Sequence, residues 1–175
     1  AFMPAHKQLN WANLFAQQEY RFLSDWQLTL GVRLETNEYT DLEFLPNAKI
    51  SWKESNDRVL WLSLARAVRA PSRIDRDFYL PGNAPFLLAG GPHFRSEIAK
   101  TIELGWRAKE GALTYSVIAY HTDYDRLRSL DLQLNGSFMF ENNIEGNTQG
   151  VEALINYQMA DSWSVEASAF TLDED

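Results

Sequence analysis

The segment Trp26-Gln27-Leu28-Thr29-Leu30-Gly31-Val32-Arg33-Leu34-Glu35 alternates apolar and polar residues without a break. Successive side chains of a β-strand point to opposite faces, so a strand with this sequence has one apolar wall and one polar wall. The period of two residues, in place of the helical period of 3.6, is the main signal for a strand. The segment therefore predicts a β-strand with a single apolar face.

The same alternation recurs along the chain, whereas signals for helices are weak. It predicts about eight long strands. They are expected at residues 9–23, 26–36, 44–55, 58–69, 97–109, 112–123, 139–159 and 163–171. Gly146 is a candidate position for a break in the seventh of these strands. The predicted fold class is all-β, an antiparallel up-and-down meander.

Short and long connectors alternate between the predicted strands. The long connectors are residues 37–44, 70–96 and 124–138. The short turns, which contain the Asn, Asp, Gly and Ser residues that suit tight hairpins, are Ser24-Asp25, Asn56-Asp57, Glu110-Gly111 and Ala160-Asp161-Ser162. All short turns then fall at one end of the sheet and all long loops at the other. Transmembrane barrels show this asymmetry, with short periplasmic turns and long extracellular loops.

Aromatic side chains gather near the short turns. A row of aromatic rings at one level is typical of a membrane–water interface, where one side of the ring is apolar and the other wet. Trp61 is an exception, because it falls on the face opposite Leu60 and Leu62. Either the strand contains a β-bulge or its face assignment is different. The aromatic residues of the row are Tyr20, Phe22, Trp26, Trp52, Trp61, Trp106, Tyr115, Tyr157 and Trp163.

The composition excludes several classes of function. The chain has 175 residues, no Cys and a net charge of -8. Without Cys there is no disulfide framework, thiol nucleophile or Cys-ligated metal site, and the negative charge disfavours binding to nucleic acid. No apolar run reaches the roughly 18 residues of a transmembrane helix. The first residues do not resemble a signal peptide, so the chain is mature, cytosolic or cut from a larger protein. It stops just after a strand pattern, which favours the last of these.

No catalytic, metal or cofactor site is predicted. His121, Asp123 and Asp125 share one face of a strand, but no second cluster completes a metal shell, and a strand that enters a polar loop explains them better. No Gly-x-Ser-x-Gly or Gly-rich phosphate motif occurs. Acid–base catalysis needs two carboxylates at a defined separation, and no pattern brings together the candidates, which are Glu97, Glu103 and Glu152.

Six landmarks along the chain, taken in order, resemble the C-terminal half of the barrel of TonB-dependent outer-membrane receptors. They are Trp26–Glu35, Leu45–Lys53, Arg66–Ser72 with its Arg-Ala-Pro-Ser end, Phe94–Glu97 with Thr101–Trp106, Tyr120–Tyr124, and Asn142-Asn143 with Gly150–Glu152. The resemblance covers residues 8–172. It implies that residues 1–175 are one partial β-barrel domain, with neither plug nor signal peptide, from a transmembrane barrel of about 22 strands.

The resemblance also implies a function. The chain is expected to belong to a receptor, not an enzyme, that binds a scarce nutrient such as an iron chelate and imports it across the outer membrane of a Gram-negative bacterium. The implied partners are outer-membrane lipid, the TonB system through a plug that lies elsewhere, and the extracellular nutrient. An isolated fragment would expose its apolar wall and free edges, so we expect it to self-associate. The residues do not distinguish among siderophore, haem, cobalamin and glycan.

The connector after Pro71 carries the candidate ligand-binding residues. Proline has no N–H to donate, so Pro71 ends the strand at the side of the long loops. Arg66 and Arg69 do not share a face by parity and are assigned no joint site. Aromatic and Arg side chains bind chelates by stacking and charge pairing, although the same residues could equally pack the loop. The candidates are Arg73, Asp75, Arg76, Phe78, Tyr79, Phe86 and His93.

Two other interpretations remain open from the sequence. One is a soluble β-barrel or sandwich that binds a small ligand, and the other is a small eight-stranded outer-membrane barrel. Burial separates the first from the membrane interpretation. In a soluble barrel, Leu30, Leu104 and Ile155 would lie in an intramolecular core, whereas in a membrane barrel they face outward.

Overall fold

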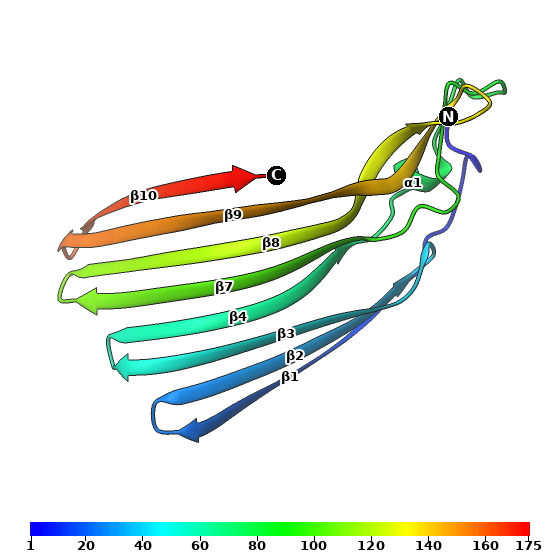
Figure 1. The fold of residues 1–175 in the computed structure, drawn as a ribbon. Coiled ribbons are helices and arrows are strands. Elements are labelled where there is room, and N and C mark those ends of the chain that lie inside the picture. The colour runs from blue at the N-terminus through cyan, green and yellow to red at the C-terminus, as the bar shows by residue number, and fades with distance from the viewer.

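A computed structural model describes all of residues 1–175 (Figure 1). The long strands are β1 (Trp11–Leu23), β2 (Trp26–Asn37), β3 (Thr40–Ser55), β4 (Arg58–Arg69), β7 (Glu97–Glu110), β8 (Leu113–Leu132), β9 (Phe138–Ala160) and β10 (Trp163–Glu174). The segment between β4 and β7 contains α1 (Arg73–Asp77), β5 (Tyr79–Leu80) and β6 (Leu88–Ala89). The eight long strands pair antiparallel in chain order, which confirms the predicted meander. No helix has the length and apolar character needed to cross a membrane.

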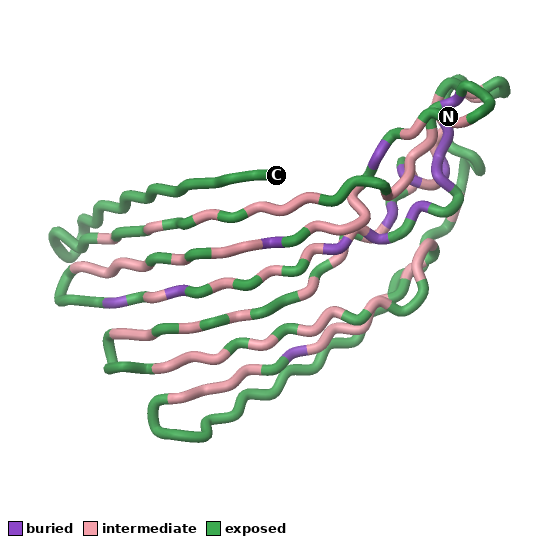
Figure 2. Tube along the Cα trace, viewed as in Figure 1, coloured by how far each residue is buried: buried purple, intermediate pink, exposed green.

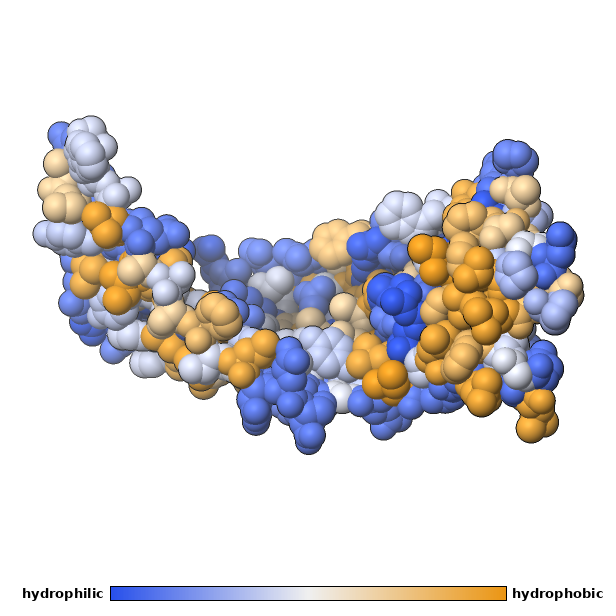
Figure 3. All heavy atoms as spheres, turned by 90° about the horizontal axis from the view of Figure 1, so that it is seen from above, coloured by the Kyte–Doolittle hydropathy of each residue, from blue (hydrophilic) through white to orange (hydrophobic).

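The sheet is open and curved. Strands β1 and β10 form its two outer edges and do not pair with each other, so the sheet is a partial barrel that is not closed. Viewed from above, the molecule bends into a trough (Figure 3). The short strand β6 runs parallel to β9, with Leu88 opposite Phe138, and this pairing joins the long connector to the sheet.

The four predicted short turns lie together at one end of the sheet, opposite α1 and the irregular connector (Figure 1). At the other end, the prediction of a long connector at 37–44 is wrong, because β3 already begins at Thr40. The side-chain oxygen of Asn37 accepts the backbone N–H groups of Tyr39 at 2.8 Å and Thr40 at 3.2 Å. Asn in this position closes a tight turn through its own side chain, so the strands extend further than their alternation suggests.

The prediction of a long loop at 124–138 is also wrong, because β8 continues to Leu132. Its turn is closed by Asn135, whose side-chain oxygen accepts from Ser137, and by Gly136, whose φ of 83° disfavours residues with a Cβ. The candidate break at Gly146 does not occur, since β9 is continuous there. The irregularity lies in the partner strand instead, at Arg126, which has a φ of 60° and sits at a register shift.

One face of the sheet is apolar and nothing in the chain packs on it. Directly paired residues share a face, and the register places Leu30, Ala48, Leu64 and Ile102 in one row across β2, β3, β4 and β7. The exposed fractions are 50% for Leu30, 51% for Leu104 and 48% for Ile155. These side chains do not form an intramolecular core. Their exposure is the arrangement expected of a membrane barrel and not of a soluble barrel.

Trp61 lies on the opposite, polar face. The β4 register shows no shift between Val59 and Arg69, so the strand has no bulge and the aromatic row near the short turns does not include Trp61. Its Nε1–H donates to Glu103 Oε1 at 2.7 Å, and the Lys49 ammonium lies 4.7 Å from its ring centroid. The alternation had placed Trp61 on this face, and the hydrogen bond explains why: an indole N–H needs a polar partner.

Most of the buried residues lie where the connector meets the strands (Figure 2). Phe94 is fully buried, and Ala89 and Ile98 are nearly so. Elsewhere the sheet is one layer thick and most residues are half-buried or exposed. The packed part of the chain therefore fixes the connector against the loop end of the strands.

The β3–β4 pairing stops before either strand ends. Its last pair is Asn47 with Ala65, and the next residue of β3, Pro46, has no N–H to donate. Arg66 spans the interrupted seam: Nη1 donates to the Phe44 carbonyl at 2.6 Å, and Nη2 lies 3.3 Å from a Glu43 carboxylate oxygen. A side chain thus satisfies a carbonyl that the backbone ladder leaves free.

Candidate functional site

Arg69 joins three elements at the loop end of the sheet. From the last position of β4, it donates Nε and Nη2 to the two carboxylate oxygens of Glu97 on β7, at 2.6 and 2.7 Å. Its Nη1 donates to Asp75 of α1 at 3.0 Å. A guanidinium that binds both oxygens of a carboxylate fixes direction as well as distance. The fork to Glu97 fixes the Arg69 guanidinium on the barrel wall, and the bond from its Nη1 to Asp75 holds the connector against that wall.

Asp75 is the fully buried centre of this cluster. It accepts from the backbone N–H and the hydroxyl of Ser72, both at 2.8 Å, and from Arg128 of β8 at 3.2 Å. Ser72 and Asp75 form a capping box at the start of α1. Burial raises the pKa of Asp75, but the Ser72 N–H and the Arg69 guanidinium outweigh it, so the pKa lies below its usual value. The carboxylate is thereby held charged.

Asp77, at the other end of α1, ties the connector to the β2–β3 turn. The Tyr39 hydroxyl donates to it at 2.6 Å, Arg73 Nε lies at 3.3 Å and Lys7 Nζ at 3.5 Å. Burial and the bond to Asp77 raise the pKa of Tyr39 to about 12. The hydroxyl therefore remains a donor over the physiological range, and its bond to Asp77 joins the β2–β3 turn to α1.

Most of the predicted ligand residues hold the connector together. Phe78 packs edge-on against Phe2, with ring centroids 5.5 Å apart. The ring centroids of Tyr79 and Phe86 are 4.9 Å apart. Arg73 places its guanidinium 4.6 Å from the Phe2 ring and donates to backbone oxygens of the N-terminal segment. Together with the buried aspartate, these residues make contacts within the loop end. The two other predicted residues, Arg76 and His93, line a groove.

The groove is polar and has a volume of about 470 Å³. Arg76 is held in it by a 2.7 Å bond from Nη1 to the Phe94 carbonyl. The side chains of His93 and Arg95 make no hydrogen bond or ion pair within the chain, so both can bind a ligand. The seven lining residues are Arg76, Pro92, His93, Arg95, Glu141, Asn142 and Asn143.

Asn142 builds the groove from two distant segments. Its side-chain oxygen accepts the backbone N–H of Arg95 at 2.6 Å, and its amide donates to the carbonyls of Arg95 at 3.1 Å and Arg126 at 2.7 Å. Sequence reasoning missed Arg95 and Asn142 as site residues, although both lie in segments that carried the family resemblance. No local pattern shows that residues 92–95 meet 141–143, because 47 positions separate Arg95 from Asn142.

The other candidate chemical groups are dispersed. His121 Nε2 lies 3.1 Å from Asp123, whereas Asp125 pairs with Arg126 at 3.8 Å. No three metal-binding side chains converge in the chain. Glu97 is bound by Arg69 and Glu103 by Trp61. The loop-end groove, which has no hydrophobic residue in its lining, is therefore the candidate polar site for an external ligand.

Comparison with known proteins gives the family. The family described as TonB dependent receptor-like, beta-barrel, matches residues 2–175. This chain belongs to the TonB-dependent receptors. A comparison with curated protein sequences found no match.

Solved TonB-dependent receptors share this fold. The siderophore receptor PirA from Pseudomonas aeruginosa superimposes with a TM-score of 0.78 at 16% identity, covering 95% of this chain and 34% of PirA. The ferric enterobactin receptor PfeA gives a TM-score of 0.77 at 20% identity, covering 93% and 27%. The FrpB iron transporter from Neisseria meningitidis gives 0.72 at 13% identity, covering 98% and 27%. The chain thus spans about a third or less of each of these receptors.

Membership of the TonB-dependent receptors assigns the two faces of the sheet. These receptors are transport proteins of the Gram-negative outer membrane, not enzymes. In such a barrel the apolar face contacts lipid and the polar face lines the lumen. The wall with Leu30 and Leu104 therefore faces the membrane, and Trp61 with Glu103 faces the lumen. The cluster of Arg69, Asp75 and Arg128, called the capped cluster below, lies with the groove at the end of the sheet away from the short turns. This is the extracellular end.

Proposed function

We propose that this chain forms part of the wall and part of the extracellular surface of a receptor that binds an iron chelate of the siderophore class and imports it. The fold likeness to a siderophore receptor and to a ferric enterobactin receptor supports this substrate class. Residues 1–175 form one partial barrel domain in this proposal. The plug and the contact with the TonB system come from other parts of the receptor.

The groove with two Arg side chains and one His carries the proposal. Ferric chelates of the catecholate and carboxylate types are anionic, and a guanidinium binds such oxygens through two parallel hydrogen bonds. The side chains of Arg95 and His93 form no hydrogen bond or ion pair with other residues of the chain. Arg76 is held in place by the Phe94 carbonyl. The amide groups of the neighbouring Asn residues add neutral donors at the rim.

The capped cluster supports binding by making the groove rigid. A ligand binds more tightly to groups that are already in position, because less conformational entropy is lost. Arg69, Asp75 and Arg128 connect β4, α1 and β8 beneath the connector. In this proposal the predicted ligand residues Arg73, Asp75, Phe78, Tyr79 and Phe86 shape the loop, and Arg76 and His93 touch the ligand with Arg95.

Iron uptake by the full-length receptor tests the proposal. A strain that lacks the receptor is complemented with wild-type, His93→Ala/Arg95→Ala, or Arg58→Gln, and uptake of radiolabelled ferric enterobactin is measured under iron limitation. The double variant should take up about tenfold less, because it loses two charge-assisted contacts. Arg58→Gln is the matched control, since it removes an exposed Arg that pairs with Glu110 at the short-turn end.

Two outcomes would overturn the proposal. One is wild-type uptake by the double variant at equal receptor abundance in the outer membrane. The other is no difference in uptake of any ferric chelate between the wild-type and deletion strains.

A further inference from the structure

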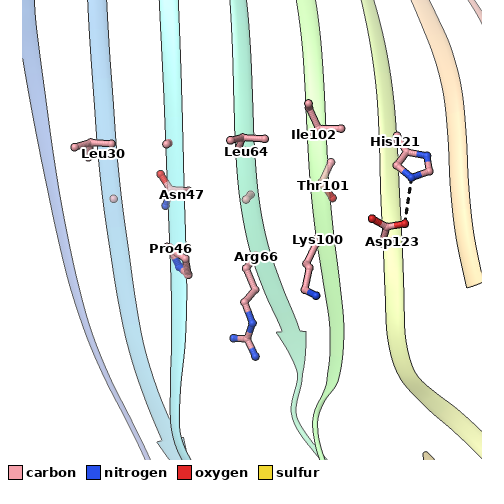
Figure 4. Close-up of a pocket in the computed structure, with 13 residues that line it drawn as sticks. Leu30, Pro46, Asn47, Leu64, Arg66, Lys100, Thr101, Ile102, His121 and Asp123 are labelled. Atoms are coloured by element: carbon pink, nitrogen blue, oxygen red, sulfur yellow. Dashed lines mark hydrogen bonds and ion pairs between the residues drawn. The ribbon is translucent and has the colours of Figure 1, made fainter. Parts of the chain in front are cut away.

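The chain exposes two separate apolar surfaces. The first is the wall of the sheet, on which Leu64 and Ile102 are followed by Arg66 and Lys100 toward the loop end (Figure 4). The apolar band of a transmembrane barrel ends where the membrane does, so this change marks the outer border of the band. The second surface lies beyond that border, where β8 ends and β9 begins. Lipid covers the first surface in a receptor of this family but does not reach the second.

The second surface, called the apolar tip below, is one face of a small sheet formed by β5, β6, β9 and β8. Directly paired residues share a face, and the register sets Leu80 opposite Leu88 and Leu88 opposite Phe138. Phe138 in turn lies opposite Leu132, which is 67% exposed, and Leu134 in the following turn is fully exposed. In the view from above, apolar side chains gather over this end of the molecule (Figure 3). A row of apolar side chains therefore crosses the tip.

A polar stretch separates the apolar tip from the wall. It consists of residues 121–128 of β8 and 141–145 of β9, most of which are charged or polar. The tip is therefore not a continuation of the surface that lipid covers, and its side chains meet water. A contiguous apolar patch that a protein exposes to water is commonly a binding surface.

The apolar tip lies next to the loop-end groove. On β9, Phe138 precedes the groove residues 141–143, and the groove residues Pro92 and His93 follow shortly after Leu88 of β6. Because β6 and β9 pair side by side, the segments that line the groove continue directly into the tip. At about 3.3 Å per residue, Phe138 is roughly 10 Å from the nearest groove residue of its own strand. One ligand can therefore contact both surfaces.

We propose that the groove and the apolar tip form one site for an amphiphilic ferric chelate. A carboxylate-bearing head lies in the groove on Arg95, and an acyl tail lies on the row from Leu80 to Leu132. The inference rests on the proposed function and narrows its substrate class. The guanidinium suits the carboxylate head. The groove has no hydrophobic residue in its own lining, so the tip is the apolar surface next to a ligand held there. The row crosses four strands, roughly 14 Å, which accommodates a medium-length acyl chain.

Two matched chelates test the proposal. They share one citrate-based head and carry either an octanoyl or an acetyl cap, and their radiolabelled ferric complexes are bound to the full-length receptor in lipid nanodiscs. Wild-type should bind the octanoyl chelate about tenfold more tightly, because several methylene groups leave water. Leu132→Gln should reduce this ratio about threefold. Leu42→Gln should leave it unchanged. It is the matched control, a Leu with 65% exposure on β3, which pairs with no strand of the tip.

The variants separate the tail, the head and the lipid. Partition of the octanoyl chain into the nanodisc would raise its apparent affinity equally for wild-type, Leu132→Gln and Leu42→Gln. His93→Ala/Arg95→Ala should weaken binding of both chelates to the same degree, so the ratio of their affinities stays as in wild-type.

Equal affinity of wild-type for both chelates would mean that other loops of the receptor cover the tip, and it would overturn the inference. The same ratio in wild-type and Leu132→Gln would also overturn it, because the gain would then come from lipid. Neither result touches the proposed function, which the uptake of ferric enterobactin decides separately. Absence of binding by either chelate would overturn the inference as well.

Discussion

Arg69 binds both carboxylate oxygens of Glu97, at 2.6 and 2.7 Å, across the directly paired ends of β4 and β7. The same guanidinium also reaches Asp75, so one side chain joins two strands of the barrel wall to the connector that carries the groove. Within the Arg-Ala-Pro-Ser run, each part has a separate task. Arg69 holds the connector, Pro71 ends the strand and Ser72 caps α1.

Replacing Arg69 should loosen the connector without changing the barrel wall. Arg69→Gln loses the fork to Glu97 and leaves Asp75 with one fewer cationic partner, which should cost about 1 to 2 kcal/mol because the Arg side chain is partly exposed to water. Limited proteolysis of the full-length receptor should then cut residues 70–96 several times faster. Arg58→Gln, which breaks an exposed pair at the opposite end, should leave this rate unchanged. An unchanged rate in Arg69→Gln would show that the fork is not needed.

Acid should loosen the same connector through Asp75. The pKa of Asp75 is lowered in the folded state, so its contribution to stability is complete above the unfolded-state pKa of about 3.9 and is lost as the pH falls through the lower, folded value. Pepsin cleavage of residues 70–96, normalised to a reference peptide at each pH, should rise as the pH falls below about 4. Asp75→Asn should show faster cleavage at pH 5 and a flatter profile below it. A wild-type profile that is flat from pH 5 to pH 2 would contradict this role.

The period-two alternation predicted the wall of the barrel, because contact with lipid on one face requires an apolar residue at every second position of each strand. The bounds of β4 agree with the predicted strand, and the short-turn ends of β2 and β3 agree as well. At the loop end the strands leave the membrane, and the alternation of apolar and polar residues stops. The extension of β8 to Leu132 rests on the Asn135–Gly136 turn, where the sequence alone predicts a long loop.

The candidate site was less predictable than the wall. The connector was correctly singled out as irregular, but the sequence does not show which of its charged residues are used internally. Asp75 is buried because Arg69, six positions before it, and Arg128, on a strand 53 positions later, converge on it. Arg95 is held at the groove because Asn142 binds its backbone. Contacts of this range depend on tertiary pairing, and no local spacing encodes them.

Gly105 should be required for Trp61 to lie flat on the lumen face. A Cβ added at Gly105 would meet the Trp61 ring at 2.1 Å, and moving the ring would break the bond from its Nε1 to Glu103. Gly105→Ala should therefore lower the free energy of unfolding by about 1 to 3 kcal/mol, measured by urea denaturation of the lipid-reconstituted receptor. In a Trp61→Ala background the same substitution should cost much less. Equal costs in both backgrounds would place the constraint in the backbone and not in the ring.

The 175-residue chain, when produced alone, should not be a monomer in water. Leu30 and Leu104 are about half exposed on a wall that lipid covers in a receptor of this family, and β1 and β10 present unpaired backbone edges. We expect the chain to remain in solution only with detergent bound or as a self-associated species. Sedimentation velocity across a detergent dilution series should show the sedimentation coefficient rising as detergent falls below its micellar concentration.

Leu30→Lys/Leu104→Lys should shift this onset to lower detergent, because charges on the wall oppose face-to-face contact. The matched control is Thr29→Lys/Thr101→Lys, which places the same charges on the polar face and should leave the onset unchanged. A monomer that stays compact without detergent would mean that the apolar wall is covered from within the chain, contrary to the exposure of its side chains.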